Sequence, residues 1–152
     1  MMEKKLPVFG GAKPKAPTAS EWEALAARIK RPLTAPVVDV LVPVYGGFAE
    51  TMRCIYSVLD CEQKTSFNLL VVNDCSPDPE ICGELRRLSS AGLIELHELP
   101  ENLGFVGACN FGMGLHRDRD VLLLNSDTEV YSDWLDRIRR AAYRNGRTGT
   151  VT

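Results

Sequence analysis

A polar and acidic cluster follows an apolar run at positions 121–124. In it Asp127, with Asn125 two positions earlier and Glu129 two later, offers oxygen ligands for a divalent cation. A strand buried on both faces is typically a continuous run of Val and Leu, and open parallel sheets bind ligands at the carboxyl ends of their strands. Carboxylate and amide oxygens suit Mg²⁺ or Mn²⁺ held together with phosphate oxygens. The same residue types are common in solvated turns, so this motif alone leaves a metal site and an idle turn open.

Two more apolar runs end in residues that could contact a ligand. The first ends in Pro43, Val44 and Tyr45, and the second ends in an Asn followed by Asp74. The Asp74 carboxylate could accept a hydrogen bond from a nucleobase or ribose, or it could belong to a turn before the next helix. Because Asp78 suits the N-cap of that helix, Asp74 is left for a ligand.

A glycine-rich segment at positions 102–112 is the third candidate site, and it includes Asn102 and Gly104. Glycines at a helix start allow close backbone approach and leave amide groups free for an anion. Close packing of a helix on a sheet explains the same residues equally well. The segment is not a G-x-G-x-x-G fingerprint and does not follow the first strand, which argues against a dinucleotide site.

The elements that must position these residues alternate between strand and helix, which predicts an α/β fold with a mostly parallel sheet and helices on both faces. We expect strands at 37–42, 67–72, 93–99 and from Val121, and helices at about 48–59, 78–92, 105–115 and 133–144. Connections in such sheets are right-handed, so the polar strand ends should open on one edge of the sheet. Three of these ends would then converge on one crevice.

Two regions are expected along the chain. Residues 1–36 should form a tail and a short peripheral helix, whose capping box would be Ser20 with Glu23, and residues 37–152 should form the ligand-binding domain. After Gly146 the sequence looks like the approach to another strand. We therefore expect it to be part of a longer protein.

Composition excludes several classes of protein. With 152 residues, 25% charged residues and a net charge of −2, the chain fits one globular domain and not a disordered or nucleic-acid-binding protein. The five cysteines lack zinc-like spacing, and His97 and His116 are far apart in sequence, so reduced thiols and ordinary histidines are expected. With no run of about 20 apolar residues, a cytoplasmic location follows, and peripheral attachment to the inner face of a membrane is left open.

Four stretches together resemble the nucleotide-sugar-binding half of family 2 glycosyltransferases of the GT-A fold, including rhamnosyltransferase-like members. They are residues 40–45 (VLVPVY), 69–76 (LLVVNDCS), 102–105 with 110–112 (NLGF and NFG), and 122–128 (LLLNSDT). Their order and spacing are more specific than any one motif. The resemblance implies a domain that stops before the acceptor-binding half.

The resemblance also implies roles for individual residues in binding the donor, a nucleoside-diphosphate sugar. Pro43, Val44 and Tyr45 would line the nucleobase pocket, and Asp74 would bond the imide of uracil or thymine, so UDP- or dTDP-linked sugars are favoured. Asn102, Gly104, Asn125 and Ser126 would shape the rest of the donor site.

Asp127 resembles the last acid of the family's Asp-x-Asp signature, which holds Mg²⁺ or Mn²⁺ against the diphosphate. Here Asn125 replaces the first acid of that signature, and Asn73 replaces an acid that often precedes Asp74. Asn125 can still coordinate through its amide oxygen, but it removes a negative charge. Forms with Asn at this position resemble bacterial enzymes that transfer rhamnose or similar sugars in cell-surface polysaccharide assembly.

Family 2 enzymes invert the anomeric centre, using a carboxylate base to deprotonate the hydroxyl of a saccharide or lipid-linked acceptor. The resembling base would lie beyond the segment present, and Glu129 would be a poor substitute. Two alternatives are weighed against this enzyme: a nucleotide-binding fragment without turnover, and a nucleotidyltransferase. The latter should carry a basic loop after its first strand, and positions 43–47 contain no Lys or Arg.

Overall fold

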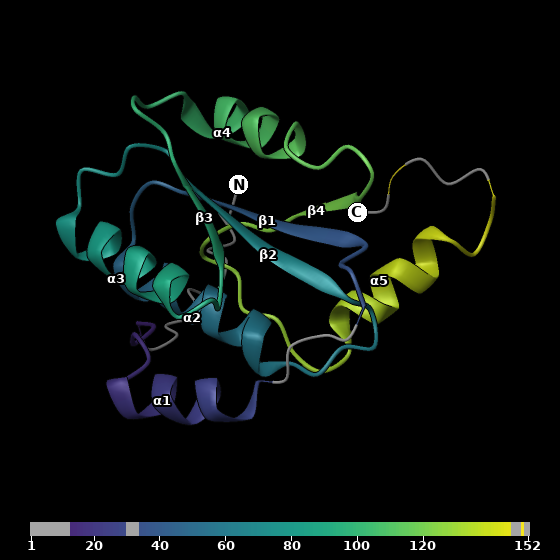
Figure 1. The fold of residues 1–152 in the computed structure, drawn as a ribbon, viewed down its shortest axis with the longest axis horizontal. Coiled ribbons are helices and arrows are strands. Elements are labelled where there is room, and N and C mark those ends of the chain that lie inside the picture. The colour runs from purple at the N-terminus through teal and green to yellow at the C-terminus, as the bar shows by residue number, and fades with distance from the viewer. Residues whose placement is uncertain (1–12, 30–33, 147–149, 151–152) are drawn as a thin grey trace, which may run out of the picture.

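A computed structural model of the chain describes residues 13–29, 34–146 and 150. Helices and strands alternate along this part of the chain after a first helix (Figure 1). The helices are α1 (Ala19–Arg28), α2 (Phe48–Asp60), α3 (Pro79–Ser90), α4 (Gly104–Met113) and α5 (Trp134–Ala142). The strands are β1 (Val38–Val44), β2 (Phe67–Asn73), β3 (Glu95–Glu98) and β4 (Asp120–Leu123).

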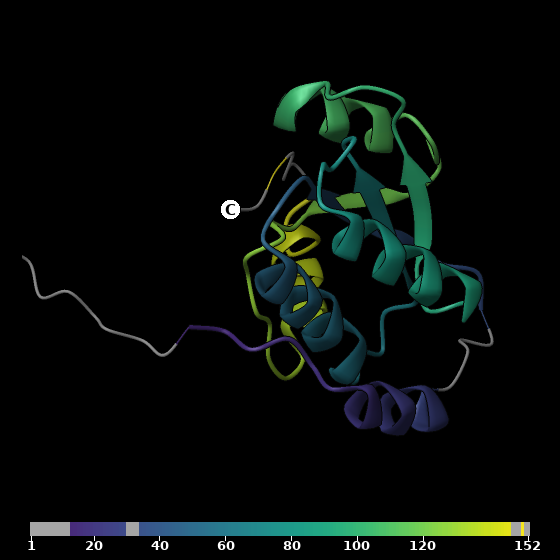
Figure 2. The ribbon, with the colours of Figure 1, turned by 90° about the vertical axis from the view of Figure 1, so that its left-hand side faces the viewer.

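The four strands form one parallel sheet in the order β3-β2-β1-β4, with β1 at its centre. Successive side chains of a strand point to opposite faces. On one face, the valines at positions 38, 40, 42 and 44 join a core with residues of α1, α2, α3 and α5. On the other face, Leu41 packs with Leu70, Val72 and Ala108 of α4. Figures 1 and 2 show α4 alone on that side. The α/β class and the mostly parallel sheet covered on both faces are therefore confirmed.

Helix α4 approaches β1 closely because glycine faces the sheet. A Cβ atom added to Gly112 would lie 2.5 Å from Cδ1 of Leu41, which is fully buried. The packing explanation of the glycine-rich segment therefore holds for this glycine.

Local capping signals set the starts of two helices. The Asp78 side chain caps α3 by accepting a hydrogen bond from the Glu80 N–H, and Pro79 stands in the first turn, as the sequence predicts. The capping box of α1 is formed by Thr18 and Glu21, so the pairing of Ser20 with Glu23 is wrong. Trp22 and Leu25 of α1 are buried in the core that also contains residues of α2.

Strand β4 differs from its expected environment. The sequence predicts burial on both faces, but only Leu124, just after the strand, is buried, and Leu123 is 47% exposed. The reason is the strand order, because among the described strands β4 pairs only with β1 and so forms an edge. Strand β3 is also shorter than the expected 93–99. Within the described residues, no helix is long and apolar enough to cross a membrane.

A buried acid lies in the α4-side face of β1. Asp39 is 1% exposed and accepts hydrogen bonds from Asn68 and Arg119 at 3.0 and 2.9 Å, and one of its oxygens is 2.8 Å from Nδ1 of His116. Burial alone raises the pKa of Asp39, but these hydrogen bonds outweigh it and bring the pKa below its usual value.

Candidate functional site

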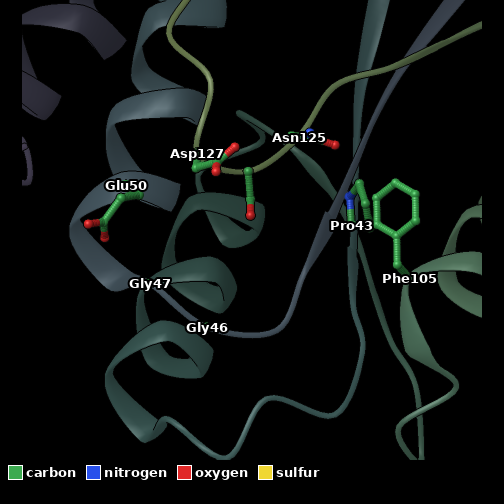
Figure 3. A pocket seen from close by; sticks show the side chains of 8 residues that line it. Pro43, Gly46, Gly47, Glu50, Phe105, Asn125 and Asp127 are labelled. Atoms are coloured by element: carbon green, nitrogen blue, oxygen red, sulfur yellow. The ribbon is translucent and has the colours of Figure 1, made fainter. Parts of the chain in front are cut away.

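The carboxyl ends of β1 and β4 border an open pocket of about 500 Å³ (Figure 3). The turn after β1 and the start of α2 form one wall, the segment after β4 forms another, and the start of α4 lies opposite. The lining residues are Pro43, Gly46, Gly47, Glu50, Phe105, Asn125, Ser126 and Asp127. A pocket at this edge of a parallel sheet is where such folds bind their ligands.

The segment after β4 is held at the pocket by backbone hydrogen bonds. The Leu124 N–H donates to the Leu41 carbonyl at 2.9 Å, which continues the pairing with β1. The Thr128 N–H donates to the Asn125 carbonyl at 3.1 Å and closes a turn that presents Ser126 and Asp127. The motif is thus both a turn and a pocket wall.

The polar groups of the pocket are acids, an amide and a hydroxyl. Two carboxylates, from Glu50 and Asp127, line it, and no Lys or Arg belongs to the lining that the structure describes. Within the described part of the chain, the Asp127 carboxylate makes no hydrogen bond or ion pair to another residue. An anionic ligand in this pocket would therefore meet uncompensated negative charge unless a cation accompanied it.

The oxygen atoms of the pocket suit a metal ion that is bound partly by the protein and partly by a ligand. They do not suit a metal ion enclosed by protein groups alone. No three His, Cys, Asp or Glu side chains of the described ranges lie together as metal ligands would. Mg²⁺ and its analogues are commonly held by one or two carboxylates plus phosphate oxygens. Asp127 and the amide oxygen of Asn125 fit that arrangement.

Pro43, Val44 and Tyr45, at the carboxyl end of β1 and just after it, lie in three different environments. Pro43 lines the pocket, whereas the Val44 side chain is buried in the core. Tyr45 is 50% exposed and is not part of the pocket lining. The side chains of Pro43 and Val44 point to opposite faces of the sheet because the strand continues to Val44, and Tyr45 follows the strand.

Asp74 connects the end of β2 to the start of α4. Its side chain is 4% exposed and accepts a hydrogen bond from the Leu103 N–H at 2.7 Å, while its own N–H donates to the Val44 carbonyl at 2.8 Å. Beside it, the Asn102 side chain accepts a hydrogen bond from the Gly104 N–H at 2.8 Å. Gly104 has a φ of +71°, which glycine adopts without strain.

The sequence-predicted residues thus fall into two groups. Pro43, Asn125, Ser126 and Asp127 meet in the pocket, while Asp74, Asn102 and Gly104 meet at the start of α4. Phe105 directly follows the second group and lines the pocket of the first.

Sequence reasoning did not identify Glu50 and Phe105 as pocket residues. The first turn of the helix after β1 is a recognisable place for a ligand-facing acid, which is a signal for Glu50. Phe105 is 57% exposed. The sequence does not show which surface an exposed aromatic at a helix start will face, because that depends on where the helix packs.

Glu129 is close to the pocket but is a poor base. Its hydrogen bond from Arg53 is the main cause that holds the pKa of Glu129 below its ordinary value. A carboxylate that is stabilised in its charged form accepts a proton less readily. This agrees with the sequence-based rejection of Glu129 as the acceptor-activating group.

The sequence model described as "Glycosyl transferase family 2" matches residues 39–152, which is most of the chain. The chain belongs to glycosyl transferase family 2. A comparison with curated protein sequences gives no significant match.

Solved structures resemble the fold of this family 2 domain. Residues 1–349 of S. aureus TarS in complex with UDP superpose with a TM-score of 0.57 at 23% identity, covering 67% of this chain and 30% of that one. GalNAc-T7 with UDP, GalNAc and Mn²⁺ superposes with a TM-score of 0.57 at 16% identity, covering 88% of this chain and 32% of that one. Both are glycosyltransferases of the GT-A fold, so the expected fold is confirmed. The chain spans about a third of each of these structures.

Proposed function

We propose that this family 2 domain binds a nucleoside-diphosphate sugar and contributes the donor site of an inverting glycosyltransferase. The observation that carries the proposal is the pocket at the ends of β1 and β4, which the Asn125–Asp127 turn lines within a matched family domain. The solved structures named above contain UDP, which supports a nucleotide donor.

In this proposal Asp127 and Asn125 hold Mg²⁺ or Mn²⁺ against the donor diphosphate. The absence of Lys and Arg from the described pocket lining supports a bound cation, because two carboxylates would otherwise repel the diphosphate. When bound, the ion neutralises charge that develops on the leaving nucleoside diphosphate. Ser126 contributes a hydroxyl beside the ion ligands.

The nucleobase of the donor lies toward Pro43 and Tyr45, and the Asp74 carboxylate accepts a hydrogen bond from the imide N–H of the nucleobase. One carboxylate oxygen of Asp74 accepts the Leu103 N–H, which leaves the other oxygen for the base. Asn102 and Gly104 act by shaping the start of α4, and Val44 acts through its backbone. A uracil or thymine base donates its imide N–H, so UDP- or dTDP-linked sugars fit this group.

The acceptor and the cellular role belong to the whole enzyme. The acceptor is a saccharide or lipid-linked hydroxyl compound, and the product belongs to bacterial cell-surface polysaccharide or glycoconjugate synthesis. All five cysteines are free, which supports a reducing, cytoplasmic compartment at or near the inner face of the membrane. The base that deprotonates the acceptor is not assigned to a residue of this chain.

Calorimetric titration of the 152-residue chain with UDP, dTDP and GDP, each with Mn²⁺ or with EDTA, tests the donor site. We expect Mn²⁺ to tighten binding of UDP or dTDP, and we expect Asp127→Ala to weaken the Mn²⁺-dependent binding at least about tenfold. Asp118→Ala, which removes an exposed acid outside the pocket, is the matched control. Unchanged binding in Asp127→Ala would contradict the metal site.

The variant Asp74→Asn tests how the nucleobase of the donor is recognised. Its amide oxygen can still accept the Leu103 N–H, but its NH₂ group would then face the base. We expect UDP binding to fall about tenfold and CDP binding to rise, because the cytosine N3 is an acceptor. Equal losses for UDP and CDP would contradict a direct contact between Asp74 and the base. Assaying sugar transfer alongside binding separates an active enzyme from a nucleotide-binding fragment.

A further inference from the structure

The segment that carries Asp127 lies along α2, and Figure 3 shows Asp127 on a loop beside the helix that carries Glu50. This segment leaves β4 and continues to α5 at Trp134. A loop that presents ligand groups needs fixed points on either side of them. Residues from one helix supply both.

The first fixed point precedes Asp127. The Sγ atom of Cys54 donates to the carbonyl oxygen of Asn125 at 3.4 Å, and the same carbonyl closes the turn with Thr128. Cys54 is fully buried between α2 and this segment.

The second fixed point follows Asp127. The guanidinium of Arg53 pairs with the Glu129 carboxylate at 3.2 Å, and the Tyr131 hydroxyl donates to the same carboxylate at 3.1 Å. One residue later, the buried Val130 N–H donates to the Ser57 hydroxyl at 3.1 Å. That hydroxyl donates in turn to the Cys54 carbonyl at 2.8 Å, which fixes its direction.

We propose that Arg53, Cys54 and Ser57 are positioning residues that hold the turn 125–128 in its ligand-binding shape. The proposal rests on the proposed function, because it assigns these residues to the same donor site. None of the three lines the pocket, so they act on the ligand only through the loop. Their bonds bracket Asp127, whose own carboxylate stays free of partners in the described part of the chain.

The physical effect is preorganisation. A loop that must be ordered when a ligand binds loses conformational entropy at that moment, and binding weakens accordingly. A loop already fixed at Asn125, Glu129 and Val130 avoids that cost. The gain falls on contacts that the turn itself makes, namely those of Asp127 and Asn125 with the metal and diphosphate.

The test compares Glu129→Gln, which removes the ion pair at the protein surface, with Glu84→Gln. Glu84 pairs with Arg87 within α3, at 2.6 Å and away from the pocket, so it is a matched control. We expect Glu129→Gln to weaken Mn²⁺-dependent binding of whichever of UDP, dTDP and GDP the wild type binds by about two- to fivefold. Binding in EDTA and the thermal midpoint should stay unchanged, and the charge swap Arg53→Glu with Glu129→Arg should restore affinity.

Amide hydrogen exchange of the ligand-free chain supplies a readout that does not depend on nucleotide binding. We expect the Thr128 and Val130 amides to exchange faster in Glu129→Gln than in the wild type, and roughly tenfold faster in Ser57→Ala than in the wild type. Exchange in Glu84→Gln should equal that of the wild type. Unchanged exchange, or an equal loss of binding with Mn²⁺ and with EDTA, overturns the positioning role. Failure of the wild type to bind any of the nucleotides overturns the proposed function instead, and the exchange rates still decide whether α2 holds the loop.

Discussion

Two aspartates near opposite ends of the sheet have carboxylates in opposite environments. At the carboxyl end, Asp127 is exposed and unpaired within the described ranges, which leaves it available to a ligand. At the opposite end of β1, Asp39 is buried and fully engaged by Asn68, His116 and Arg119. The carboxylate of Asp127 is thus accessible to a ligand, whereas that of Asp39 is enclosed by its hydrogen-bond partners. Sequence reasoning passed over Asp39, although an acid inside an apolar strand is itself a signal of buried partners.

Asp39 should make the protein sensitive to acid. Because its folded pKa is lowered, its contribution to stability is present above the unfolded pKa of about 3.9 and is lost as pH falls through the folded value. We expect Asp39→Asn to lower the free energy of unfolding at pH 7 by about 2–4 kcal/mol and to flatten its decline below pH 4. Urea denaturation across pH 2–7, with Asp118→Asn as control, measures both effects. Parallel acid slopes in wild type and Asp39→Asn would contradict this role.

Among the elements, α4 connects the core to the site. Its inner face packs on β1 through Gly112 and Ala108, and its start carries Phe105 into the pocket next to the Asp74 bond. Because Phe105 lines the pocket from the start of α4, we expect a shift of α4 away from the sheet to change the shape of the pocket. The small residues of α4 keep the distance between helix and sheet short.

Adding a side chain at Gly112 should force α4 away from the sheet. We expect Gly112→Ala to destabilise the fold by about 1–3 kcal/mol, because the new Cβ would overlap the buried Leu41 side chain. Gly83→Ala is the control, since a Cβ atom in that position of α3 meets no atom within 4 Å. It should instead stabilise the fold by about 0.5–1 kcal/mol. Denaturant midpoints of the two variants should therefore move in opposite directions.

At the scale of the whole molecule, local patterns predicted more than long-range ones. The spans of β1, α2, β2 and α3 follow from short-range periodicity and from caps such as Asp78, which need no knowledge of the tertiary fold. The edge position of β4 depends on strand order, so the exposure of Leu123 could not be predicted from its apolar run. The pocket is similar: the sequence indicated Asn125–Asp127, but the opposing Glu50 becomes a neighbour only when β1 and β4 pair. The assignment of residues 1–36 to a separate region stays a prediction.

The pairing of β4 with β1 also sets an order of folding. β1 and β2 are joined by a single helix, whereas β4 must return to β1 after three helices and two further strands have intervened. Contacts between residues far apart in sequence form late, because the loop between them must close first. We therefore expect the β1-α2-β2 unit to assemble early and β4 to dock last. The turn that presents Asp127 follows β4 directly, so we expect the proposed donor site to become complete only when β4 docks.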